Sequence, residues 1–182
     1  MSTVVIGIGG NLISRFGSAV STVQEAISRL DEDENLSVLK VSPLYKSRPM
    51  PVSDQPDYIN AAVLVETELN PGQLLAFLQY MELEMGRMPS DRWGSRIIDL
   101  DILAYDLAVL PNQKSWDDIT HTMDPREVVI EAVVPHPRLH ERAFASVPFA
   151  KIAPKWRHPV FGTTISEIAG NLAKTQELVE IV

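Results

Sequence analysis

The sequence predicts an α+β protein with a ferredoxin-like βαββαβ order, in which an antiparallel sheet packs with helices to form a sandwich and C-terminal additions follow. Two observations predict this class: short runs rich in β-branched residues, and two stretches whose apolar residues recur every three or four positions. The 182 residues, 45% of them hydrophobic, suit a single domain over 1–182, because no break in composition divides the chain.

The first half of this order comes from three segments. Residues 3–8, TVVIGI, form an apolar run that ends at two glycines and is typical of a strand. Residues 36–47, rich in β-branched side chains, are expected to form one strand, and the prolines in 48–57 mark a loop. Between the strands, residues 18–30 are expected to be helical because apolar side chains fall at helical spacing, at Val20, Val23, Ile27 and Leu30.

The second half repeats the pattern. Residues 58–67 are expected to form a strand, and Asn70 with Pro71 predicts the start of a helix that ends near Gly86. A polar loop, 87–95, then leads into a last apolar strand. Two helices on one face of the sheet would leave its other face open.

The remainder of the chain gives fewer patterns. A short strand is expected at 128–130. Thr164 starts the sequence TISE, which has the form of a capping box and predicts a last helix.

The composition narrows the expected partners and compartment. A net charge of −8 disfavours nucleic acid and anionic membranes, and no apolar run approaches the roughly 20 residues of a membrane helix. Because the chain has no cysteine and no signal-peptide pattern, we expect a cytoplasmic protein, and we expect it to be a monomer. The arginines concentrated in one third of the chain are either ordinary surface residues or the site of a small anion such as a polyphosphate: Arg87, Arg92, Arg96, Arg126, Arg138 and Arg142.

Two aspartates stand inside the apolar run RIIDLDIL. In a strand, Asp99 and Asp101 share one face while Ile98, Leu100 and Ile102 share the other. At roughly 6 to 7 Å apart, two such carboxylates repel by about 2 to 3 kcal/mol, and a bound divalent cation would reverse that sign. Solvated aspartates at a strand edge are the competing interpretation. The apolar neighbours favour a site for Mg²⁺, which takes carboxylates together with substrate phosphates.

The stretch VPHPRLHERAF suggests a phosphate site. His136 is held between two prolines, six residues before Arg142, and is either a phosphate donor or an ordinary surface or core histidine. Arg138 and His140 are optional further members of such a site.

A flat ligand is suggested by Tyr58 and Asn60, because strand alternation puts the ring and the amide on one face. This pairing suits stacking and edge hydrogen bonds to a heterocycle. Trp93 and Phe144 are further aromatic side chains near loops, although aromatic residues usually belong to a core.

Taken together, these motifs resemble those of the 6-hydroxymethyl-7,8-dihydropterin pyrophosphokinase family of folate biosynthesis. RWGSRIIDLDIL resembles the family signature, and other stretches follow in the family's order from about residue 4 to residue 154: IGIGGN, YKSRPMPVSDQPDYINAAV, ELEMGR and VPHPRLHERAFASVPFAKIAP. The resemblance implies a ferredoxin-like sandwich whose members transfer the β,γ-pyrophosphoryl group of ATP to the pterin's hydroxymethyl oxygen and release AMP.

The resemblance also implies roles for individual residues. Asp99 and Asp101 would hold two Mg²⁺ ions on the triphosphate, and the lid loops 48–57 and 87–95 would exclude water. The catalytic set would be Arg87, Arg92, Arg96, Asp99 and Asp101. The nucleotide would be bound by Glu82, Trp93, Arg96, Ile102, His136 and Arg142. The pterin would stack between two rings and be bound by Gly9, Ser47, Arg48, Met50, Tyr58, Asn60, Trp93 and Phe144.

The chain departs from the family pattern in several places. The loop GRMPSDRWGS lacks the second of two alternate arginines and is shorter, so Arg92 would take over part of its role. The segment 107–130 is longer than expected, and Glu131 stands near the position of an adenine-side arginine. Single replacements are Gly10 and Ser47, for a usual serine and threonine, and Ser95 for a usual proline.

Two other functions stay open. A magnesium-dependent nucleotidyltransferase also uses a DxD pair, but it would release pyrophosphate instead of AMP and would leave Phe144 and DQPDYIN without a role. A family relative with the altered loop would bind pterin or nucleotide and turn over weakly or not at all. Calorimetric binding without AMP formation would indicate that second alternative.

Overall fold

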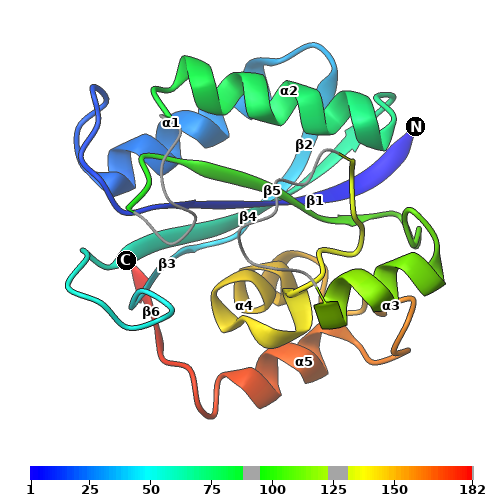
Figure 1. The fold of residues 1–182 in the computed structure, drawn as a ribbon. Helices are drawn as coiled ribbons and strands as arrows, with labels where there is room; N and C mark the ends of the chain where they lie inside the picture. Colours follow the sequence, from blue (N-terminus) through cyan, green and yellow to red (C-terminus); the bar gives the residue numbers. More distant parts are fainter. Residues whose placement is uncertain (88–94, 123–130, 182) are drawn as a thin grey trace.

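The protein is described by a computed structural model that covers residues 1–87, 95–122 and 131–181 (Figure 1). The predicted βαββαβ order is present, with a further strand division inside it and a C-terminal extension. The elements in chain order are β1 (Ser2–Gly10), α1 (Ala19–Glu32), β2 (Leu36–Val41), β3 (Leu44–Ser47), β4 (Tyr58–Thr67), α2 (Pro71–Glu84), β5 (Asp99–Tyr105), α3 (Gln113–Thr122), the 3-10 turn η1 (Leu139–Glu141), α4 (Ala143–Ile152), α5 (Ile165–Leu172) and β6 (Leu178–Ile181).

The strands form one antiparallel sheet in the order β5-β1-β4-β3-β6, and β2 also pairs with β4. The prediction of a single strand over 36–47 is wrong, because Ser42 and Pro43 divide it into β2 and β3, which pair with opposite halves of β4. The Ser42 N–H donates to the Ala62 carbonyl and its hydroxyl accepts the Ala62 N–H, each at 2.9 Å. Pro43 has no N–H with which to continue the ladder.

The predicted helix starts are confirmed by their caps. The Ser18 hydroxyl accepts the Ser21 N–H at the start of α1. Asn70 and Gln73 form a reciprocal capping box at the start of α2, and Thr164 and Glu167 form another at α5. These short-range signals fixed the positions of the helices along the chain.

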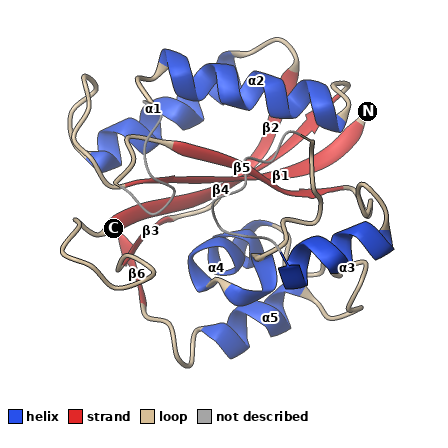
Figure 2. Cartoon of the chain, in the orientation of Figure 1, coloured by secondary structure: helices blue, strands red, loops and turns tan. Residues whose placement is uncertain are grey.

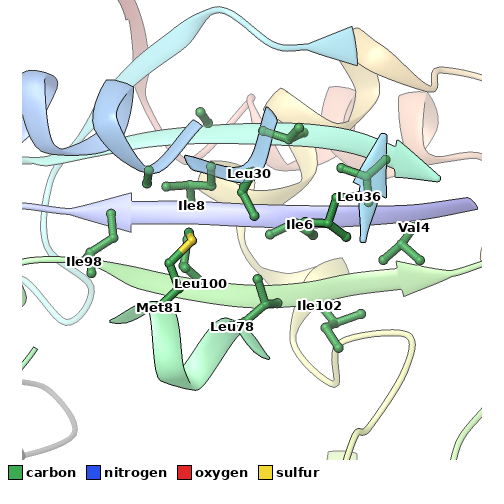
Figure 3. Packing of buried hydrophobic residues seen from close by; sticks show 14 of the residues in the cluster. Val4, Ile6, Ile8, Leu30, Leu36, Leu78, Met81, Ile98, Leu100 and Ile102 are labelled. Atoms are coloured by element: carbon green, nitrogen blue, oxygen red, sulfur yellow. The ribbon is translucent and has the colours of Figure 1, made fainter. Parts of the chain in front are cut away.

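Helices α1 and α2 cover one face of the sheet (Figures 1 and 2). Alternate residues of the strands point into this layer and form the larger apolar core with side chains of both helices. Figure 3 shows part of it, where β1 and β5 meet α2, and the labelled residues include Val4, Ile6, Ile8, Leu78, Met81, Ile98, Leu100 and Ile102. Ile98, Leu100 and Ile102 therefore share a face, as the alternation predicts.

The opposite face was expected to be open, and this is wrong for half of it. Helices α4 and α5 pack there, below the sheet in Figure 1, and α4 contacts β4 and β3. A second apolar core fills this contact, with Val5, Ala62, Leu103, Phe149 and Ile165 among its members. The described part of the chain has no helix long and apolar enough to cross a membrane.

Three elements of the C-terminal half were not predicted: α3, α4 and β6. Helix α3 buries a single residue, Trp116, so it has no apolar stripe to reveal it in the sequence. Helix α4 is apolar over most of its length and contains Pro148, which obscures the helical pattern. The strand predicted at 128–130 lies outside the described residues.

Candidate active site

The face of the sheet that carries the second core also carries, toward one end of β1, β4 and β5, a group of polar residues. Gly9 of β1 pairs with Asp99 on one side and with Asn60 on the other, and Gly7 pairs with Asp101. Because neither glycine has a side chain, the floor between the aspartates and Asn60 stays open. The side chains of Asp99 and Asp101 point away from the larger core between the sheet and helices α1 and α2, as predicted.

A cavity of about 700 Å³ lies over this floor. It borders the sheet, the loop after β3, the second half of α2 and the segment before α4. It brings together all the described residues to which the family resemblance gives a role: Gly9, Ser47, Arg48, Met50, Tyr58, Asn60, Glu82, Arg87, Arg96, Asp99, Asp101, Ile102, His136, Arg142 and Phe144. Residues from five separate segments of the sequence thus meet at one site.

Two arginines and two carboxylates form an ion-pair network at one end of the cavity. Arg87 and Arg96 both bind Oδ1 of Asp99, through their Nη1 atoms at 2.9 and 2.7 Å. Arg87 also pairs with Glu82, whose Oε1 accepts the Leu100 N–H at 2.6 Å. Glu82 therefore links α2 to β5 and holds Arg87 beside Asp99.

The carboxylates in this network have displaced pKa values. Burial, followed by the charge of Asp99, raises the pKa of Glu82 to about 8, although Arg87 and the Leu100 N–H act to lower it. Burial and Asp99 likewise raise the pKa of Asp101 to about 7, against the lowering effect of Arg142 and Arg96. The site is thus built so that negative charge within it is costly without further positive charge.

Asp101 differs from Asp99 in its contacts. Asp99 binds two guanidinium groups, whereas Asp101 accepts no hydrogen bond within the described part of the chain. A part-buried carboxylate that lines a cavity beside a second carboxylate is a donor set that suits a hard divalent cation. Among the described residues, no group of three or more histidine, cysteine or acidic side chains could hold a metal.

The segment before α4 presents His136 and Arg142 to the cavity. The His136 backbone N–H donates to the Leu103 carbonyl of β5 at 2.9 Å, and its Nδ1 accepts the Arg138 N–H at 3.1 Å. With Nδ1 as an acceptor, the neutral ring carries its proton on Nε2. From the other side, the buried indole of Trp116 donates to the Pro135 carbonyl at 2.6 Å, so α3 braces this segment.

The predicted pterin residues lie together on the sheet and at α4. The Asn60 amide donates to the Ser47 hydroxyl at 2.9 Å, which fixes its orientation across β3 and β4. Tyr58 lies half-buried beside Arg96 and Asp99, and burial raises the pKa of its phenol. Phe144 lies near Arg142, whose guanidinium carbon is 5.5 Å from the ring centroid.

Asn11 is a connecting residue that the sequence did not single out beyond the weak match IGIGGN. It is buried, its Oδ1 accepts the Arg96 N–H at 2.9 Å, and its Nδ2 donates to the Pro56 carbonyl at 3.0 Å. It therefore joins the end of β1 to the predicted lid loop 48–57 and to Arg96, the first residue after the loop 87–95. Beside it, Gly10 is required by packing, since a Cβ there would lie 2.4 Å from the Ile97 carbonyl oxygen.

Some predicted residues lie elsewhere or differ in detail. His140 does not line the cavity; it packs beside Trp116 and Phe161, with ring centroids 6.2 and 4.8 Å away. Ile102 borders the cavity, but its side chain belongs to the core between the sheet and helices α1 and α2, so only its backbone is suited to contact a ligand. Arg92 and Trp93 lie outside the described residues. Arg138 and Glu131, the latter close to the position expected for an adenine-side arginine, do line the cavity.

The fold is an α+β sandwich, and its site combines a carboxylate pair with several arginines. Such a set of charged groups is typical of enzymes that transfer phosphate groups with a divalent cation. Residues 5–154 match the family model of 7,8-dihydro-6-hydroxymethylpterin-pyrophosphokinase (HPPK). The chain therefore belongs to this family, and the resemblance seen in the sequence is confirmed.

Relatives of the family support the same assignment. The 2-amino-4-hydroxy-6-hydroxymethyldihydropteridine pyrophosphokinase of Haemophilus influenzae is 35% identical over 153 residues, which are 84% of this chain and 82% of the relative. The Bacillus subtilis protein of the same name is 33% identical over 147 residues, covering 81% of this chain and 75% of that protein. The crystal structure of wild-type Plasmodium falciparum HPPK-DHPS shares the fold, with a TM-score of 0.66 at 17% identity. That match covers 95% of this chain but only 41% of the Plasmodium chain.

Proposed function

We propose that this protein transfers the pyrophosphoryl group of ATP to the hydroxymethyl oxygen of 6-hydroxymethyl-7,8-dihydropterin, with release of AMP, in folate biosynthesis. The observation that carries the proposal is the single cavity in which the carboxylate pair, the arginines and the ring-and-amide group of the family motifs meet. Each of these three parts suits a different portion of the two substrates.

The positively charged side chains suit the triphosphate of ATP. Arg96, before β5, and Arg142, before α4, both line the cavity, and the neutral His136 ring carries an N–H on Nε2. Hydrogen-bond donors placed where negative charge increases in the transition state are among the strongest contributors to catalysis of phosphoryl transfer. Arg87 binds Asp99 in this structure. In this proposal its guanidinium group turns toward the phosphates when ATP binds.

The residues present fit Mg²⁺. Asp99 and Asp101 are the proposed ligands, and Asp101 is a carboxylate with no hydrogen-bond donor among the described residues. Two ions would neutralise triphosphate charge and help orient the reacting oxygens. The two carboxylates alone do not complete a coordination shell, which agrees with the preference of Mg²⁺ for phosphate and water oxygens beside one or two carboxylates.

The ring-and-amide group suits the pterin. Tyr58 and Phe144 border the cavity from β4 and α4, and the Asn60 amide, oriented by its bond to the Ser47 hydroxyl, also lines it. A flat bicyclic ring would stack on these aromatic side chains and take edge hydrogen bonds from Asn60 and from backbone groups near Ser47 and Arg48. Its hydroxymethyl group would then lie on the side of the cavity that holds the aspartates.

The remaining assignments are also part of the proposal. Arg92 and Trp93 would complete the phosphate and nucleotide contacts from the loop 87–95. Residues 1–182 would act as one domain and as a monomer in the cytoplasm, in line with the acidic, cysteine-free composition.

Product analysis tests the proposed reaction. The protein is incubated with ATP, Mg²⁺ and 6-hydroxymethyl-7,8-dihydropterin, and the nucleotide products are separated. Formation of AMP in proportion to pterin pyrophosphate supports the proposal. Release of inorganic pyrophosphate in place of AMP would establish nucleotidyl transfer, and calorimetric binding of both substrates without AMP would establish a binding relative.

A further inference from the structure

Gln176 lies between α5 and β6, outside the residues 5–154 that match the family. Its side-chain amide makes two hydrogen bonds to the backbone on either side of Arg142. Nε2 donates to the Glu141 carbonyl at 2.8 Å, and Oε1 accepts the Ala143 N–H at 2.8 Å. The amide therefore holds the backbone of Arg142 from both directions.

The second of these bonds solves a local problem at the start of α4. Ala143 is the first residue of the helix, so its N–H has no partner within the helix. Arg142 occupies the N-cap position, where serine, threonine, asparagine or aspartate usually supplies an acceptor. A guanidinium group has only donors and cannot do this. Gln176 accepts the N–H of Ala143, the first helical residue, whereas a usual N-cap side chain accepts that of the second or third. The start of α4 thus has a side-chain acceptor from a distant part of the chain, although an arginine stands at the N-cap.

The start of α4 carries two side chains of the candidate site. Arg142 and Phe144 both line the cavity, and they lie close enough to each other for a cation–π contact. Both project from the same helical turn, so a shift of this turn would move the phosphate contact and the ring contact together. Ala143 itself is fully buried, which makes its unpaired N–H costly if the Gln176 acceptor is lost.

We propose that Gln176 is a positioning residue for the reaction: it fixes the start of α4 so that Arg142 meets the phosphates and Phe144 covers the pterin ring. Gln176 acts through the backbone of residues 141–143 and does not itself touch either substrate. That Arg142 and Phe144 contact phosphates and pterin rests on the proposed function, whereas the contact between Gln176 and the backbone of residues 141–143 does not.

The test compares Gln176→Ala and Gln176→Glu with the wild-type protein. Thr175→Ala is the matched control, because it changes the neighbouring residue, whose hydroxyl donates, within the described part of the chain, to the Leu172 carbonyl alone. The first measurement is the hydrogen-exchange rate of the Ala143 amide. The second is the dissociation constant of the protein for each of two ligands, α,β-methylene-ATP in the presence of Mg²⁺ and 6-hydroxymethylpterin. The third is the pair of kinetic constants kcat and KM. All are measured well below the thermal midpoint of every variant.

Gln176→Ala is expected to exchange the Ala143 amide at least tenfold faster and to weaken the binding of both ligands by about tenfold, a loss typical of a buried donor left without its acceptor. Gln176→Glu keeps an acceptor for Ala143 and loses the donor to Glu141, so its losses are expected to be smaller. Thr175→Ala is expected to match the wild type.

Two results would overturn the inference. One is an unchanged Ala143 exchange rate in Gln176→Ala, since the amide would then not hold this turn. The other is faster exchange with both dissociation constants unchanged, which would limit Gln176 to a structural role. Failure of the wild-type protein to form AMP would count against the proposed function alone, because neither the exchange rates nor the affinities require turnover.

Discussion

The two faces of the central sheet are built from the same strands but meet different demands. The face toward α1 and α2 is apolar and buried over residues 4–8 of β1, 59–65 of β4 and 100–102 of β5. The opposite face is apolar only where α4 and α5 cover it, and elsewhere it carries glycines, Asn60 and two aspartates. Both faces thus bury apolar side chains, but only the second face also carries the candidate site. Substitutions on the two faces should therefore separate loss of folding from loss of function.

The largest expected effect is on the site face, at Asp101. Asp101→Asn should reduce the rate of AMP formation by about a thousandfold, because one of two proposed Mg²⁺ ligands is weakened where phosphate charge must be stabilised. The thermal midpoint should stay level or rise, because burial makes the native carboxylate costly. Asp31→Asn, the same change at an exposed position of α1, is the control. Near-normal turnover in Asp101→Asn would refute the metal assignment.

On the face toward α1 and α2, Leu78→Ala should lower stability and leave activity nearly unchanged. Leu78 is fully buried in the core between α2 and the sheet, so its truncation should lower the free energy of unfolding by about 2 to 5 kcal/mol. Below the unfolding transition, kcat should stay within about twofold of the wild type. Leu83→Ala, on the same helix but 61% exposed, should change the free energy of unfolding by no more than about 0.5 kcal/mol. A strong loss of kcat in folded Leu78→Ala would show that the faces are not independent.

Tyr58→Ala tests which part of the site face recognises the ring. Loss of a stacking partner should weaken 6-hydroxymethylpterin by about tenfold and leave the affinity for Mg²⁺ with α,β-methylene-ATP nearly unchanged. Tyr58→Phe keeps the ring and should bind pterin almost as the wild type does. Calorimetry measures both affinities, and an equal pterin affinity in all three proteins would remove the stacking role.

Glu82 joins the two faces and should make stability depend on pH. Its pKa rises from 4.5 to about 8 on folding, so the folded state binds this proton more tightly than the unfolded chain does. Its contribution to the free energy of unfolding is therefore full below about pH 4.5 and is lost as the pH rises toward about 8. Glu82→Gln should flatten this part of the pH profile, measured by urea unfolding at several pH values. An identical slope in both proteins would contradict the raised pKa.

Much of the fold and of the candidate site follows from short-range patterns in the sequence. The alternation of Asp99 and Asp101 with Ile98, Leu100 and Ile102 placed the carboxylates on one face, because neighbouring side chains of a strand must point to opposite sides. The cap signals at Asn70 and Thr164 located two helix starts, because each satisfies N–H groups within a few residues, and the apolar spacing over 18–30 located a third helix. The roles of individual site residues, Arg92 and Trp93 included, stay predictions, and the experiments above address those of Asp101 and Tyr58.

Other features depend on contacts between distant segments, and only the tertiary structure decided them. The pairing of β2 and β3 with opposite halves of β4, the cover that α4 and α5 give to part of the second face, and the links made by Asn11 and Gln176 all join residues far apart in the chain. A local pattern records which backbone conformation a segment favours, but not which distant group will satisfy its polar atoms or cover its apolar side. That is settled by how the layers pack, which sequence periodicity does not encode.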